Sequence, residues 1–176
     1  MQKGMGFLKL ASERYSVRKF SRDPVPREVI STILKAGHVA PTACNLQPQR
    51  ILVIDEAESL ERLKKCTRFH FDAPAALLVC CHRGECWQRK QDGKTSGEID
   101  AGIVATHMML EAAALGVGTT WVMSFSPEAV REEFRLPEPI DPVALLVMGY
   151  PAEDAKPFPS HSEFRPEEEL VVYNRF

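Results

Sequence analysis

The segment from Ile99 to Leu115 constrains the fold more than any other part of this sequence. Its apolar residues are spread around much of the circumference of an expected helix, and Ala101, Ala105 and Ala112 would allow another helix to approach closely. A helix that is apolar on most sides must be buried, either at the centre of a domain or at a subunit interface. Gly116 follows, where such a helix can end.

Short β-branched and apolar runs predict the strands of a sheet. The expected strands are Ile51 to Ile54, Ala75 to Cys81, Thr119 to Phe125 and Pro142 to Met148. Four further helices are predicted by apolar spacings of three and four residues and by helix-start signals. They are Phe7 to about Arg14, Pro26 to Val39, Glu56 to Cys66, and Pro127 to Phe134 with Ser126 as its N-cap.

The C-terminal segment has a different character from the rest. It is rich in proline from Lys156 to Pro166 and then ends in the strand-like run Leu170 to Tyr173. An isolated strand needs hydrogen-bond partners on a sheet edge. We therefore expect this run to pair with a distant edge, on this subunit or on another.

Length and composition favour one ordinary globular domain over residues 1–176. The chain is 44% hydrophobic and 26% charged, and its formal net charge of −2 gives no sign of a nucleic-acid or membrane partner. The N-terminus, Met1 to Met5, lacks the pattern of a signal peptide, so we expect a cytoplasmic protein. Five cysteines, an odd number, favour reduced thiols over a disulfide framework.

Two polar stretches are candidates for binding a ligand. Arg14, Ser16 and Arg18 alternate along a probable extended segment and would point to one side, where two guanidinium forks suit a phosphate. The alternative, a solvated edge strand, is about equally supported by this pattern alone.

The second stretch is Ala40 to Arg50, a turn between a helix and a strand. Thr42, Asn45 and Gln47 offer groups that both donate and accept hydrogen bonds, which suits the edge of a heteroaromatic ring. They could equally serve only the backbone of the turn. Cys44 lies in the same turn, and no sequence feature supplies the base that a nucleophilic thiol needs.

The polar segment from His82 to Gly97 is the expected mobile lid, with Trp87 either closing over a bound ring or anchoring the loop. Cys80, Cys81 and Cys86 near His82 do not predict a metal site. Adjacent cysteines on a strand point to opposite faces, and buried free thiols are common.

Taken together, four motifs in this order resemble the FMN-dependent nitroreductase family. The motifs are Arg14 to Phe20, Ala40 to Pro48, Leu115 to Val122 and Gly149 to Pro151. Asp92 to Asp100 is similar to the small-chain branch of that family. The resemblance covers nearly the whole chain from Glu13 onward.

The resemblance implies a three-layer α-β-α fold of the α+β class, with a mixed, mostly antiparallel sheet. It also implies an intertwined homodimer with FMN at the interface and a C-terminal tail exchanged between subunits. The isolated run Leu170 to Tyr173 would then be the exchanged strand.

Carried over residue by residue, the resemblance assigns the flavin contacts. Arg14, Tyr15, Ser16 and Arg18 would hold the phosphate and ribityl chain, with Arg165 adding to the phosphate site. From the other subunit, Pro41, Thr42, Ala43 and Asn45 would approach the ring, and Gln47 the ring or the ribityl chain. Trp121, Val122, Met123 and Ser124 would line the other side, with a backbone N–H near Met123 or Ser124 directed at flavin N5.

The implied function is oxidoreduction in which NADH or NADPH gives hydride to flavin N5, and a nitroaromatic, a quinone or a similar small acceptor takes it in a ping-pong cycle. No catalytic side chain and no metal are expected. Gln47-Pro48-Gln49 departs from the commoner Gln-Pro-Trp of the family, and no acidic residue lies near Met123. Two alternatives stay open: a flavin carrier or redox sensor with little turnover, or another flavin reaction such as reductive dehalogenation.

Overall fold

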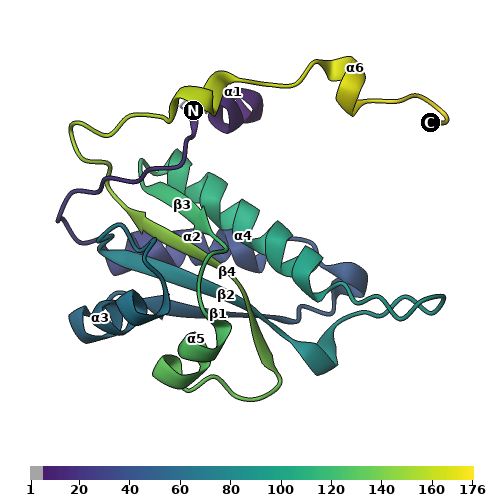
Figure 1. The fold of residues 1–176 in the computed structure, drawn as a ribbon, viewed down its shortest axis with the longest axis horizontal. Helices are drawn as coiled ribbons and strands as arrows, with labels where there is room; N and C mark the ends of the chain where they lie inside the picture. The colour runs from purple at the N-terminus through teal and green to yellow at the C-terminus, as the bar shows by residue number, and fades with distance from the viewer. Residues whose placement is uncertain (1–5) are drawn as a thin grey trace.

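A four-stranded antiparallel sheet forms the middle layer of the computed structural model, which describes residues 6–176 (Figure 1). The strands follow the order β1-β2-β4-β3, and a parallel bridge between Ser16 and Thr119 extends the sheet beyond β3. The expected mixed, mostly antiparallel sheet is confirmed. The strands are β1 (Gln49–Ile54), β2 (Ala75–His82), β3 (Gly118–Val122) and β4 (Ile140–Gly149). Met1–Met5, which carry the signal-peptide argument, lie outside the described residues.

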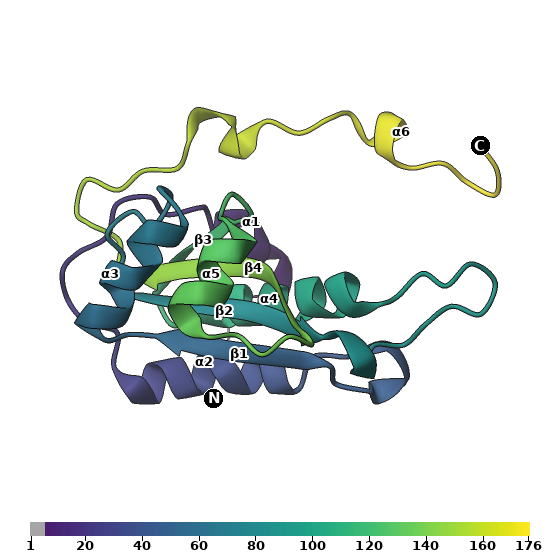
Figure 2. The same cartoon turned by 60° about the horizontal axis from the view of Figure 1, so that its bottom comes forward.

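Helices cover both faces of the sheet, as the three-layer expectation requires. Helices α2 and α4 lie on one face, and α3 and α5 lie on the other (Figures 1 and 2). The helices are α1 (Phe7–Glu13), α2 (Arg27–His38), α3 (Ala57–Cys66), α4 (Gly97–Ala114), α5 (Pro127–Phe134) and α6 (Glu167–Leu170). Within residues 6–176, no helix is both long enough and apolar enough to cross a membrane.

The core has two halves because successive side chains of a strand point to opposite faces. In β2, Leu77 packs with α2 and α4, whereas Leu78 packs with α3 and α5. Helix α4 is buried along Val104 and Met108, as its apolar circumference predicts. Ile99, near its N-terminal end, is nevertheless 56% exposed.

The C-terminal segment differs from the expected strand at Leu170 to Tyr173. Leu170 ends the short helix α6, and Val171 is extended without a strand partner. The segment leaves the body and runs past α1 into open space (Figures 1 and 2). A strand forms only where a sheet edge supplies its hydrogen bonds, and the described part of the chain brings no such edge to this segment.

The polar segment after β2 is more ordered than an irregular loop. A short 3-10 helix, η2 (Arg83–Glu85), leads into a two-stranded ribbon that projects from the body (Figure 2). A bridge between Gln88 and Thr95 and an ion pair between Arg89 and Asp92 hold the ribbon together. We call residues 87–96 the arm.

Candidate cofactor site

The segment between α1 and α2 lies along the outer edge of β3. The Val17 N–H donates to the Thr119 carbonyl oxygen at 2.9 Å, and the Thr120 hydroxyl donates to the Val17 carbonyl oxygen. Val17 is buried, whereas its neighbours Ser16 and Arg18 are half-buried and exposed. Alternation along an extended backbone therefore turns Ser16 and Arg18 away from the core.

Positive charge accumulates along this segment. Within residues 6–176, no carboxylate forms an ion pair with Arg14 or Arg18. A hollow of about 200 Å³ lies beside Arg14 and Tyr15, against the start of β3. Two guanidinium groups without an anionic partner, on the same segment as the Ser16 hydroxyl, have the donor chemistry that a phosphate requires.

The tail begins by packing on the same segment. The Tyr15 and His161 ring centroids are 6.2 Å apart, and the Arg18 guanidinium lies 5.9 Å from the Phe158 ring centroid. Arg165 comes a few residues later, where it pairs with Glu169 at 3.3 Å. Neither a hydrogen bond nor an ion pair joins Arg165 to Arg14 or Arg18 in the described residues, so its phosphate role stays a prediction.

The turn after α2 has an unusual backbone. Cys44, Asn45 and Gln47 all have positive φ angles, of 51°, 53° and 52°. Residues other than glycine rarely adopt this conformation, and it costs free energy that the surrounding structure must offset. Inside the turn, the Thr42 hydroxyl accepts the Gln47 N–H at 3.0 Å. Such strain clusters at binding sites, which favours the ligand interpretation of the turn over the purely structural one.

Asp100 holds this turn against the first part of α4, a role that the sequence pattern did not predict. Its carboxylate is buried and accepts the Ala43 N–H at 2.9 Å and the Ser96 hydroxyl at 2.7 Å. Helical spacing in the sequence does indicate that Asp100 is buried, because it lies one helical turn before Val104, on the stripe that faces the core. An acidic residue on a buried stripe needs polar partners, and here the turn supplies one of them.

The end of β3 carries the last group of predicted residues. Trp121 is half-buried, Val122 is buried, and Met123 is 63% exposed. The Thr67 hydroxyl donates to the Ser124 carbonyl oxygen at 2.6 Å, which fixes the loop after β3 to the end of α3. Across residues 6–176, no protein group accepts from the backbone N–H of Met123 or Ser124. These two N–H groups are therefore available to a ligand.

One chain keeps the turn apart from the segment Arg14 to Arg18, which we call the phosphate segment. Asp100 holds the turn near the start of α4, whereas Thr119 holds the phosphate segment just beyond the end of that helix, at Ala114. At 1.5 Å per residue, the stretch of helix between them is roughly 20 Å long. A single chain therefore does not bring all of the predicted residues around one ring.

Cys44 and Trp87 remain without an assigned role. Cys44 is exposed, and no described side chain forms a hydrogen bond with it. Trp87 is 38% exposed at the base of the arm.

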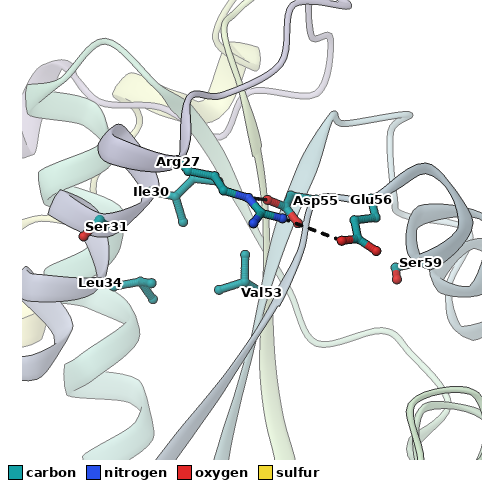
Figure 3. A pocket seen from close by; sticks show the side chains of 8 residues that line it. All are labelled: Arg27, Ile30, Ser31, Leu34, Val53, Asp55, Glu56 and Ser59. Atoms are coloured by element: carbon teal, nitrogen blue, oxygen red, sulfur yellow. Dashed lines mark hydrogen bonds and ion pairs between the residues drawn. The ribbon is translucent and has the colours of Figure 1, made fainter.

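A hollow that the sequence did not predict lies at the outer edge of β1. It has a volume of about 440 Å³, and among residues 6–176 the strand β1 pairs with β2 alone, which leaves its other edge open. Arg27 reaches across to Asp55 and Glu56, with nitrogen–oxygen distances of 3.1 and 3.6 Å (Figure 3). Because both acids neutralise Arg27, this hollow is poorly suited to a phosphate. Its lining is Arg27, Ile30, Ser31, Leu34, Val53, Asp55, Glu56 and Ser59.

Comparison with known proteins gives a consistent result. A nitroreductase family protein of Clostridium difficile 630, known from its crystal structure, is 39% identical, with a TM-score of 0.92 over 98% of this chain and 100% of that chain. An FMN-dependent nitroreductase of Clostridium difficile R20291 is 25% identical, with a TM-score of 0.78 over 96% and 99%. The NADH dehydrogenase of Thermus thermophilus is 29% identical over 86% of this chain and 88% of its own length. The family described as Nitroreductase matches residues 11–68 and 66–150, and the chain belongs to the nitroreductase family.

Proposed function

We propose that this protein is an FMN-dependent NAD(P)H oxidoreductase. The observation that carries the proposal is the pair of guanidinium groups at Arg14 and Arg18, beside Ser16 and without a carboxylate partner in the described chain. This donor set fits the phosphate end of FMN. The neighbour from Clostridium difficile R20291 is named as FMN-dependent, which supports the same cofactor.

When bound, FMN would supply hydride transfer at N5, from NADH or NADPH and then to a nitroaromatic, a quinone or a similar acceptor in a ping-pong cycle. The protein contributes binding and orientation. The strained turn at Thr42, Ala43 and Asn45 presents polar groups at a fixed position, because Asp100 holds its backbone. The backbone N–H of Met123 or Ser124 would donate to the ring and so stabilise its reduced form.

The site is completed by a second copy of the chain. The turn and the phosphate segment lie at opposite ends of α4 in one chain, so a partner must bring its turn to the first chain's phosphate segment. The tail supports the same assembly because Leu170, Val172 and Tyr173 are 64%, 49% and 77% exposed in the single chain. Exposed apolar residues on an extended segment indicate a binding partner.

The open edge of β1 is the surface that we assign to the partner's tail. A strand added there would pair with β1, and its side chains would meet Ile30, Leu34 and Val53 in the hollow of Figure 3. A homodimer with an exchanged tail would cover the edge and the apolar tail together. The cytoplasmic location stays a prediction.

The first experiment is the absorbance spectrum of the purified protein between about 300 and 550 nm, followed by anaerobic addition of NADH and NADPH, because the cofactor carries the chemistry. We expect bound flavin that bleaches rapidly with one of the nucleotides. Flavin that is present but does not respond would instead support a carrier or sensor. Failure to bind added FMN would contradict the assignment of the candidate cofactor site to FMN.

The phosphate assignment has a matched pair of variants. Arg18→Ala removes one of the two unpaired guanidinium groups, and we expect FMN to bind at least about tenfold more weakly, since a hydrogen bond to a charged group contributes about 1.5–3 kcal/mol. Arg22→Ala removes an exposed arginine four residues further along and should leave FMN affinity unchanged. Fluorescence titration of FMN measures both, and equal affinity in the two variants would refute the assignment.

A further inference from the structure

Two cysteines that the cofactor site does not use lie beside each other at the base of the arm. Cys81 is in the last part of β2, and Cys86 follows the short helix η2. Both are free thiols; Cys81 is buried, and Cys86 is half-buried. The two residues are far enough apart in the sequence for η2 to turn the chain back on itself between them.

Gly97, the first residue of α4, locates the two sulfurs. A Cβ atom built on Gly97 would lie 2.7 Å from the Cys86 Sγ and 3.0 Å from the Cys81 Sγ. Both sulfurs therefore occupy the same small space above this glycine. Any side chain at position 97 would displace them, so the close approach depends on glycine.

The two cysteines differ in the hydrogen bonds of their thiols and in what shifts the pKa of each. The Cys86 thiol donates to the His82 carbonyl oxygen at 3.3 Å. Burial raises the pKa of Cys81 to about 12, and the neighbouring Cys86 adds to that rise. Burial also raises the pKa of Cys86, and hydrogen bonding from the Cys81 thiol offsets only part of that rise. Cys86 is therefore the sulfur whose thiolate the other cysteine stabilises.

Cys86 is also the more accessible of the two thiols, since it is half-buried whereas Cys81 is buried. Both cysteines line a hollow of about 550 Å³ between the base of the arm, the start of α4, and α5, through which a small oxidant can approach. Arg83 and Arg131 line the same hollow, and both pair with Asp141. Cys80, next in the chain, points the other way into the core between the sheet and α3 and α5.

We propose that Cys81 and Cys86 form a redox-active dithiol that a peroxide converts to a disulfide. The Cys86 thiolate attacks the peroxide: an S–O bond forms as the O–O bond breaks, which gives a sulfenic acid and, after protonation, water or an alcohol. The Cys81 sulfur then attacks the Cys86 sulfur. An S–S bond forms, and the sulfenic oxygen leaves as water with the Cys81 proton. The two thiols lose two electrons in total, and the peroxide gains them.

The disulfide would restrict the position of the arm and leave the packing of the core unchanged. It would close the chain between β2 and the residue immediately before Trp87, so that the base of the arm is covalently fixed to the sheet. The proposal does not depend on flavin binding, because no residue of the candidate cofactor site takes part in it.

The test uses the full-length protein with Cys44→Ser, which removes the exposed thiol and so prevents links between chains. The protein is treated with hydrogen peroxide, blocked with N-ethylmaleimide and digested with trypsin. Cleavage after Arg68, Arg83 and Arg89 separates Cys86 from the peptide that carries Cys80 and Cys81. We expect these two peptides to be joined by a disulfide that dithiothreitol releases, with a change in Trp87 fluorescence.

Alanine variants of the three neighbouring cysteines identify which two thiols form the disulfide. Cys81→Ala and Cys86→Ala should lose the joined peptides, whereas Cys80→Ala, at the adjacent buried position, should keep them. Circular dichroism confirms that each variant is folded, and Cys86→Ala, at the half-buried position, provides the test if Cys81→Ala does not fold. The proposal is overturned if the joined peptides persist without Cys81 or Cys86, or if peroxide leaves both cysteines open to N-ethylmaleimide.

Discussion

At the scale of single residues, the buried carboxylate of Asp100 links the core to the candidate site. It accepts hydrogen bonds from the Ala43 N–H and the Ser96 hydroxyl, so one side chain joins the turn, the end of the arm and α4. The turn has three residues with positive φ and needs outside contacts to keep that shape. We infer that Asp100 positions the turn and does not itself contact the substrate.

Replacing Asp100 by alanine should loosen the turn. We expect a loss of about 2 kcal/mol in the free energy of unfolding, because a partly buried N–H loses a charged acceptor. We also expect weaker FMN binding with the same flavin spectrum once FMN is saturating. Urea unfolding and FMN titration measure the two effects.

Glu98→Ala is the control for Asp100→Ala. Glu98 lies in the same first turn of α4 but is exposed, so its removal should leave both quantities nearly unchanged. If Asp100→Ala bound FMN as tightly as Glu98→Ala, the positioning role would be wrong. Asp100→Asn keeps one acceptor oxygen and should recover part of the lost affinity.

The residues of the candidate site differ in how far sequence could predict them. Arg14 and Arg18 could be proposed from sequence because alternation along an extended segment predicts which side chains share a side. Asp100 was missed because its two partners come from a distant turn and a loop, and local periodicity carries no information about tertiary contacts. The positive φ angles at Cys44 and Gln47 were equally hidden, since neither residue is a glycine.

At the scale of elements, the junction between the phosphate segment and β3 depends on a glycine. A Cβ atom on Gly118 would lie 2.5 Å from Val17 Cγ2 and 2.8 Å from Val17 Cβ. The absence of a side chain at Gly118 is what lets the segment from Arg14 to Arg18 lie against the strand. The position of the two guanidinium groups therefore depends on this contact.

Gly118→Ala should push that segment off β3. We expect a destabilisation of about 1–3 kcal/mol, the usual cost of overpacking, together with weaker FMN binding. Gly102→Ala on α4 is the matched control, because its new Cβ would meet the Trp121 side chain only at 4.0 Å, an ordinary van der Waals distance. That change should stabilise the protein by up to about 1 kcal/mol, as expected for Gly→Ala within a helix. Thermal unfolding measures the stability of the two variants, and equal destabilisation would show that the contact between Gly118 and Val17 does not depend on glycine.

Elements with a local signal were predictable, whereas those that depend on a partner were not. Ser126 was expected as an N-cap, and its hydroxyl does accept the Ala129 N–H at 3.1 Å. The burial of Leu77 and Leu78 on opposite faces likewise follows from the apolar run. The final strand at Leu170 to Tyr173 was not found in the single chain, because its ladder requires an edge that the chain does not bring to it.

At the scale of the whole molecule, the tail and the open edge of β1 are two unsatisfied surfaces. The tail exposes apolar side chains along its length, and the edge exposes unpaired backbone groups above a hollow that Ile30, Leu34 and Val53 line in part. The two surfaces are complementary: the tail, as a strand, would supply backbone hydrogen-bond partners to the edge, and the hollow would receive alternate side chains of the tail. Tail exchange between two copies would satisfy both surfaces, and the same assembly would join the two halves of the candidate flavin site.

Removing residues 166–176 should therefore weaken the dimer and FMN binding together, and Val172→Asp should do so without shortening the chain. Burial of a valine contributes about 1.5–3 kcal/mol, so we expect the dimer dissociation constant to rise at least about tenfold. Glu168→Ala, an exposed position on α6, is the control and should leave dimer stability unchanged. Sedimentation equilibrium over a range of concentrations measures all three. A truncated chain that dimerises as tightly as the full chain would refute tail exchange, whereas loss of the dimer with full retention of FMN would show that the flavin site is complete within one subunit.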